Sequence, residues 1–276
     1  MNKFTKLLTL ATAAILSAGM LTSCGGNRDT ITVLSREEGS GTRGAFEELF
    51  EVEKTRDDAE FYNSTSVVLS SVAGDKNAIG YVSLGSLKDT VKALEIDGVA
   101  ATVENVKNGT YKITRPFNIA TKADASELAQ DFIAYIMSAE GQAVIEDNGY
   151  ISNGNTGAYA GSKPTGTLKI SGSSSISPLM EKLVEAYKKV NTAADIQLQQ
   201  SDSSTGIKDV AEGKSDIGMA SRELKDSELQ QGLTPTVICT DGVAVIVSKE
   251  NSVNGLTSEQ IKKIYVGEIS AWSELN

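Results

Sequence analysis

The chain has 276 residues, a formal net charge of −10, 22% charged residues and no histidine. The acidic balance and the lack of a basic stripe argue against a nucleic-acid partner. The absence of histidine excludes Ser-His-Asp and Cys-His catalysis, and the chain also lacks a Gly-x-Ser-x-Gly elbow and a P-loop lysine. Its acidic pairs are typical of a solvated surface. We therefore expect no enzyme, no cofactor and no metal site.

The N-terminus has the pattern of a secretory signal. Lys3 and Lys6 precede the apolar run Leu7–Leu21, which is too short for a membrane-spanning helix. The run leads into Leu21-Thr22-Ser23-Cys24, which resembles a bacterial lipobox. We expect residues 1–24 to be a signal peptide with a lipobox, and Cys24 to be the lipidated residue that anchors the protein to the extracytoplasmic face of the cell membrane. A cleaved signal with an incidental cysteine is the alternative.

The segment that follows the signal peptide predicts a strand, a tight turn and a helix. The apolar run Ile31–Leu34 is followed by the loop Arg36–Arg43, and a helical pattern begins at Ala45. The loop's glycines let the backbone approach a ligand closely. Its hydroxyls, Ser40 and Thr42, add donors beside the free N–H groups of the first helical turn. Because these donors and the helix dipole favour negative charge, the loop predicts an oxyanion site flanked by two arginines.

Two later loops repeat this pattern. Ser171–Pro178 follows the strand-like Leu168–Ile170 and precedes a helical pattern, and Ser201–Gly206 follows the alternating Ile196–Gln199 and opens a helix at Ile207. Helix capping alone explains any one of these loops. The set of three is better explained by several helix N-termini that converge on one small anion.

Strand and helix patterns alternate along the chain, which predicts an α/β protein with parallel sheets covered by helices. The apolar strand pattern Val237–Val247 contains Cys239, which we expect to be a buried thiol. About 250 residues are enough for either one domain or two.

Five segments resemble a known family: Ser35–Arg43, Asn77–Tyr81, Ser171–Leu183, Asp216–Leu224 and Leu256–Ile264. They are similar to the phosphate-binding component of the bacterial phosphate ABC importer, and the resemblance covers nearly all of the chain after the signal peptide. It implies a type II periplasmic-binding-protein fold with two lobes, a hinge and a ligand cleft between the lobes. It also implies a non-enzymatic protein that binds inorganic phosphate and delivers it to membrane permease subunits.

The two halves of the family's sequence stand here in reversed order, which indicates a circular permutation. Joining Asn276 to Gly25 gives a continuous family-like passage, and Ser152–Thr167, rich in Gly, Asn, Ser and Thr, is expected to be a flexible linker between the family's usual termini. The alternative is a fusion of fragments from two tandem genes.

The permuted order predicts one lobe made of residues 25–115 plus 248–276, which carries the Gly-Ser-Gly-Thr loop. Residues 116–247 form a continuous second lobe with the serine-rich loops. Two segments, Ile113–Ile119 and Val245–Lys249, are expected to form the hinge.

The resemblance also implies the ligand contacts, which are Arg36, Ser40, Gly41, Thr42, Ser174, Ser175, Ser203 and Ser221. The family pattern has an aspartate that accepts the proton of bound phosphate and so rejects sulfate, and Ser221 or Arg222 occupies its place here. Asp202 or Asp241 could replace this acceptor, as could Ser221 itself. A binding protein for sulfate or molybdate, and a sensory or interaction lipoprotein that retains the fold, remain alternatives.

Overall fold

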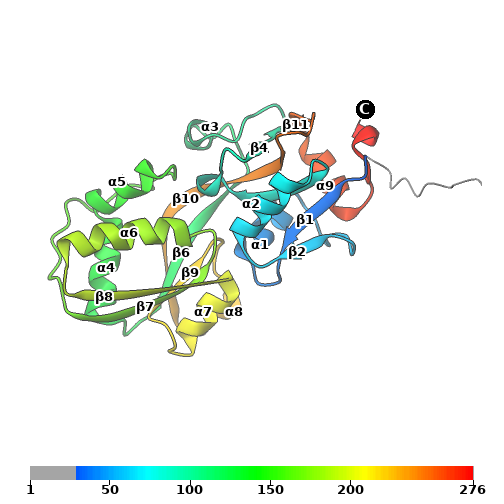
Figure 1. The fold of residues 1–276 in the computed structure, drawn as a ribbon. Helices are drawn as coiled ribbons and strands as arrows, with labels where there is room; N and C mark the ends of the chain where they lie inside the picture. The colour runs from blue at the N-terminus through cyan, green and yellow to red at the C-terminus, as the bar shows by residue number, and fades with distance from the viewer. Residues whose placement is uncertain (1–28, 276) are drawn as a thin grey trace, which may run out of the picture.

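The computed structural model describes residues 29–275 (Figure 1). The signal peptide, Cys24 and the junction between Gly25 and Asn276 lie outside the described residues. Within this range, no helix combines the length and the apolar character needed to cross a bilayer.

The described chain alternates strands with helices as the sequence predicts. The strands are β1 (Thr32–Arg36), β2 (Glu60–Tyr62), β3 (Ala78–Ser83), β4 (Val91–Ala93), β5 (Glu95–Ile96), β6 (Thr114–Lys122), β7 (Gly166–Ser173), β8 (Ala194–Ser201), β9 (Ile217–Ala220), β10 (Leu233–Ser248) and β11 (Gly255–Leu256). The helices are α1 (Gly41–Leu49), α2 (Thr65–Gly74), α3 (Val103–Lys107), α4 (Glu127–Met137), α5 (Ala139–Asp147), α6 (Ser177–Val190), α7 (Ser203–Ala211), α8 (Asp226–Leu229) and α9 (Ser258–Val266). Two short 3-10 helices cover Leu84–Ser86 and Trp272–Leu275.

One long strand joins the two halves of the molecule. The main sheet has the order β2-β1-β3-β10-β6-β9-β7-β8, and β4 also pairs with β10. The second part of β10 pairs with β3 and β4, whereas its first part pairs with β6 (Figure 1). Strand β1 is parallel to its neighbours β2 and β3, and β7 is parallel to β8 and β9, as predicted. The strands that join the halves are antiparallel.

Each half has its own hydrophobic core. We call the first half lobe 1. Its core combines residues from Ile31 to Ile113 with Val243–Val247 and residues of α9. The second, lobe 2, is built from residues between Phe117 and Cys239, and Cys239 is fully buried there as predicted.

The boundary in β10 differs from the expected one. The sequence predicts that Val243–Val247 belong to the continuous lobe 116–247 and that Val245–Lys249 form a hinge segment. These residues instead belong to lobe 1, because their backbone pairs with β3 and their side chains pack in its core. The chain therefore passes between the cores near Thr240–Gly242, beside Thr114–Pro116 of β6.

The two ends of the described chain lie together on lobe 1 (Figure 1). The Ile31 amide donates to the Ser270 carbonyl at 2.8 Å, and the Trp272 amide donates to the Asp29 carbonyl at 3.0 Å. The Tyr265 hydroxyl donates to the Leu34 carbonyl at 3.1 Å, although these residues are 231 positions apart. Strand β1 and helix α9 thus share one lobe.

The segment between Ser152 and β7, which its composition predicts to be a flexible linker, has specific contacts with lobe 2. It has no helix or strand and is mostly exposed. However, the Tyr159 hydroxyl donates to Asp131 Oδ2 at 2.6 Å, and the Gly157 carbonyl accepts from the Ala139 amide at 2.7 Å. The Tyr159 ring also lies edge-on to Tyr135, 5.3 Å between centroids. An aromatic side chain and a few backbone groups thus connect this loop to lobe 2.

Candidate functional site

Four helix N-termini meet where the lobes touch. Helices α1 and α2 belong to lobe 1, and α6 and α7 belong to lobe 2; each follows a strand and a turn rich in hydroxyls or glycine. Ser40 caps α1 by accepting from the Arg43 amide at 3.4 Å, and Asp202 caps α7 by accepting from the Thr205 amide at 2.9 Å. The first-turn N–H groups of such helices have no partner within the helix, so the arrangement suits an anion.

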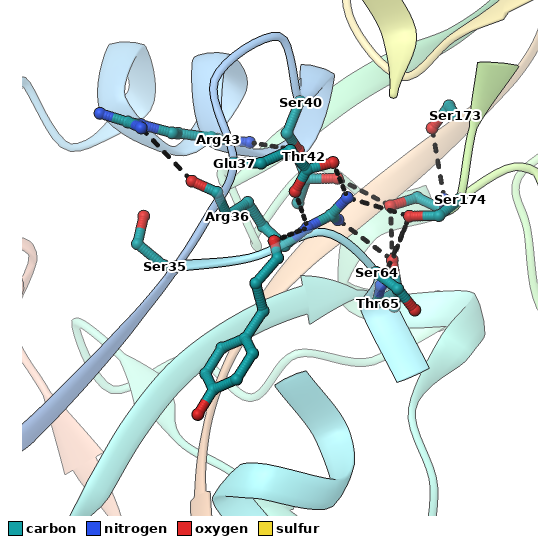
Figure 2. A network of polar contacts seen from close by, with 12 residues as sticks. Ser35, Arg36, Glu37, Ser40, Thr42, Arg43, Ser64, Thr65, Ser173 and Ser174 are labelled. Atoms are coloured by element: carbon teal, nitrogen blue, oxygen red, sulfur yellow. Dashed lines mark hydrogen bonds and ion pairs between the residues drawn. The ribbon is translucent and has the colours of Figure 1, made fainter. Parts of the chain in front are cut away.

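Side chains from the two lobes bond directly to one another at this point (Figure 2). Arg36 Nη2 donates to Ser174 Oγ at 3.0 Å, and Thr42 Oγ1 lies 2.7 Å from Ser175 Oγ. Thr65 Oγ1 lies 3.2 Å from Ser174 Oγ and 3.1 Å from Ser175 Oγ. These four hydroxyls and one guanidinium form a compact buried cluster of hydrogen-bonding groups.

A second group of contacts surrounds Gly41. A β-carbon on Gly41 would collide with Ser203 Oγ and would lie 2.8 Å from Ser221 Oγ. Ser221 Oγ accepts from Ser173 Oγ at 3.0 Å, and the Ser221 amide donates to Ser203 Oγ at 3.1 Å. The close approach explains why a glycine stands at this point of the α1 turn.

Arg36 is held from several sides. Its side chain is nearly fully buried, and its Nε and Nη2 atoms each donate to a carboxylate oxygen of Glu37 at 2.8 Å. Its backbone amide donates to the Tyr81 hydroxyl at 3.3 Å, and that hydroxyl also bonds to Ser35 Oγ at 2.8 Å. The Tyr81 ring stacks on Phe46, 3.9 Å between centroids, and burial raises the pKa of Tyr81 to about 12. The direction of the guanidinium is therefore set by its bonds to Glu37 and Thr65.

The structure brings the eight predicted ligand residues to this region. Arg36, Thr42, Ser174 and Ser175 bond across the lobes, and Gly41, Ser203 and Ser221 pack together. Ser40 caps α1 and lines a cavity of about 320 Å³ beside the cluster.

The other flanking arginine, Arg43, faces away from the cluster. It donates to Glu47 Oε1 at 2.7 Å and lies over the Phe61 ring. Sequence reasoning missed Thr65, although its signal was the same as that of the other loops: a strand, a hydroxyl-rich turn and a helix. Strand β2 has only three residues and little burial, so its apolar pattern is weak.

The two carboxylates considered as replacements for the missing aspartate have other partners. Asp202 accepts from both the amide and the hydroxyl of Thr205. Asp241 is ion-paired with Arg115 at 3.0 Å, and burial raises the pKa of the Asp241 carboxyl. Within residues 29–275, no group of three or more acidic, histidine or cysteine side chains could hold a metal ion.

Two lobes joined by long strands, with helix N-termini facing each other at their contact, define a solute-binding protein. The family model for the PBP superfamily domain matches residues 2–140 and 157–276. The chain is 50% identical, over the full length of both chains, to a phosphate-binding protein PstS 2 from Streptococcus agalactiae. It is 43% identical to a PstS 2 from Streptococcus pneumoniae, over 99% of each chain.

A solved structure supports the same assignment. The crystal structure of a phosphate-binding protein of a phosphate ABC transporter from Streptococcus pneumoniae matches with a TM-score of 0.71 and 44% identity. The match covers 90% of this chain and 100% of that chain. The chain therefore belongs to the PBP superfamily and, within it, to the PstS family of phosphate-binding proteins.

Proposed function

We propose that the protein binds inorganic phosphate outside the cytoplasm and delivers it to the permease subunits of a phosphate ABC importer. One observation carries the proposal: Arg36 and the hydroxyls at the N-termini of α1, α2 and α6 bond to one another where the two lobes meet, and Ser203 at the start of α7 lies against Gly41. The names of the streptococcal relatives support phosphate as the ligand. The ligand set is Arg36, Ser40, Gly41, Thr42, Ser174, Ser175, Ser203 and Ser221, to which we add Thr65.

This set suits a buried anion on a protein whose net charge is −10. The overall field repels phosphate, so affinity must come from short-range donors. Each hydrogen bond to a charged group contributes about 1.5–3 kcal/mol. A few such bonds, less the costs of desolvation and ordering, leave the roughly −8 kcal/mol that corresponds to micromolar affinity.

Isothermal titration calorimetry of residues 25–276 with inorganic phosphate tests the proposal. We expect saturable binding with one site per chain. A chain that is folded by circular dichroism and gives no heat with phosphate would contradict it.

A different oxyanion is the second candidate, because Ser221 or Arg222 stands where the family pattern has an aspartate. Asp202 and Asp241 are both engaged by other partners, so neither is free to accept the phosphate proton at the cluster. Titration with sulfate and molybdate, alone and in competition with phosphate, separates the candidates. Tighter binding of either anion than of phosphate would favour the second one.

We also propose that Cys24 becomes the N-terminal residue after removal of residues 1–23 and carries a lipid anchor, and that the order of segments is a circular permutation. The full-length match to streptococcal relatives supports an inherited order rather than a chance fusion of fragments. The adjacent chain ends on lobe 1 support it as well. A chain rebuilt to start at Thr167, with Asn276 joined to Gly25 and the end at Ser152, should fold and bind phosphate. Failure of that chain to fold would count against the permutation.

A further inference from the structure

A buried ion pair lies where the chain passes between the lobes. Arg115 is on β6 and Asp241 is opposite it on β10, the two strands that connect the cores. Arg115 Nη2 and Nε donate to Asp241 Oδ2 at 3.0 and 3.2 Å. The side chains are only 2% and 1% exposed. Any bending of these strands that opens the lobes must act close to this pair.

The pair has further bonds on each side. In lobe 1, Asp241 Oδ1 accepts from Ser83 Oγ at 2.9 Å and from the Gly85 amide at 3.5 Å. In lobe 2, Arg115 Nη1 donates to the Ser221 carbonyl at 3.2 Å. The ion pair thus connects lobe 1 directly to the backbone of a proposed ligand residue.

Ser221 is held on all its polar atoms. Its carbonyl accepts from Arg115, its amide donates to Ser203 Oγ, and its hydroxyl accepts from Ser173 Oγ. The contact with Gly41 limits it from the side of lobe 1. Of these constraints, the bond from Arg115 is the one that reaches the hinge strands.

A buried ion pair is a costly way to join two strands. Desolvation of both charges offsets much of their attraction, and well-packed apolar residues often serve stability equally well. Accordingly, burial lowers the pKa of Arg115 and raises that of Asp241. The distinctive property of the pair is the directed hydrogen bonding that it provides in both lobes.

We propose that Arg115 and Asp241 are positioning residues, which hold Ser221 in the ligand site and make its position depend on the bend of β6 and β10. The inference rests on the proposed binding of phosphate between the lobes. Closure of the lobes and completion of the site then occur together, because both require the same bonds at the crossing point.

A double-mutant cycle on the phosphate dissociation constant tests this. One arm replaces the pair by apolar residues (Arg115→Met with Asp241→Leu), which avoids leaving one charge buried alone; the other is Ser221→Ala. We expect the pair replacement to weaken binding about tenfold in the wild-type chain and less than threefold when Ser221 is already alanine. Coupling of this kind is the signature of two groups that act through one contact.

Arg115→Lys provides a second variant that keeps the charge but cannot bond Asp241 and the Ser221 carbonyl in the same forked geometry. If the apolar pair variant fails to fold, Arg115→Lys takes its place in the cycle and should show the same coupling to Ser221→Ala. The matched control replaces Arg56 and Asp58, an ion pair of lobe 1 outside the site, in the same way and should leave affinity unchanged.

The outcomes separate the two proposals. Wild-type protein that does not bind phosphate overturns the proposed function and this inference with it. Wild-type binding with additive effects, or with affinity unchanged in folded variants of the pair, overturns the inference alone.

Discussion

Replacing Arg36 gives the most direct test of the ligand site. Arg36→Met keeps most of the buried stem but removes the guanidinium, which now donates to Ser174 and Thr65 and faces the hydroxyl cluster (Figure 2). Methionine limits the cavity that alanine would leave. The variant therefore separates the loss of charge from the loss of packing.

The expected loss follows from the bonds that Arg36 offers. Two of its nitrogens are engaged by Glu37, so we count a single charge-assisted bond to phosphate, worth about 1.5–3 kcal/mol. At about 1.4 kcal/mol per tenfold, the dissociation constant should rise about 10- to 150-fold. The Glu37 carboxylate, left without its partner beside an anion, moves the result toward the upper end.

Calorimetry with phosphate measures the change, and thermal unfolding without ligand checks the fold. Arg56→Met is the matched control, because Arg56 is also paired with an acidic residue of lobe 1 but lies outside the site. A loss smaller than threefold in folded Arg36→Met, or an equal loss in the control, would refute the reasoning.

Three further predictions address the contact between lobes, the anchor and pH. Gly41→Ala should weaken phosphate binding by at least tenfold in calorimetry with little change in thermal unfolding, because its β-carbon collides with Ser203 Oγ only where the lobes meet; unchanged affinity would contradict this geometry. Cys24→Ser should abolish labelled-palmitate incorporation in the producing cell, and label that persists would rule out Cys24 as the lipid site. Burial raises the pKa of Tyr81 to about 12, so this tyrosine loses its proton at a lower pH in the unfolded chain than in the folded protein. The free energy of unfolding should therefore fall by up to about 3 kcal/mol as the pH rises from 10 to 12. Urea unfolding of Tyr81→Phe should show a smaller fall over that range, and an equal fall would contradict the assignment.

Much of the site could be predicted from the sequence, because the patterns that indicate it are local. A strand, a Gly/Ser turn and a helix start are written within about ten residues, and both regions show this order. Both turns are shorter than predicted, because α1 already begins at Gly41, β7 continues to Ser173 and α6 begins at Ser177. Cys239 was predictable for the same reason, since an apolar strand pattern surrounds it. Thr65 was missed because its strand is short, although the turn before α2 has the same composition.

Local sequence patterns could not predict which groups bond across the lobes. The direction of Arg43 away from the serines depends on Glu47 and Phe61, and the docking of Tyr159 depends on Asp131. The passage between the cores near Thr240–Gly242 could not be located either, because β10 is apolar on both sides of that point.

The sequence by itself determined the class of fold, the helix starts that carry the hydroxyls and glycines, and the resemblance that points to phosphate. The strand and helix pattern follows from local backbone preferences and periodicity, which act over a few residues. The resemblance rests instead on the five matching segments. Only the tertiary structure decided which of these turns face each other, and that Asp241 is engaged by Arg115 while Ser221 lies against Gly41. The physical reason is that such contacts join residues more than a hundred positions apart, so their geometry is set by the packing of two cores on one shared strand.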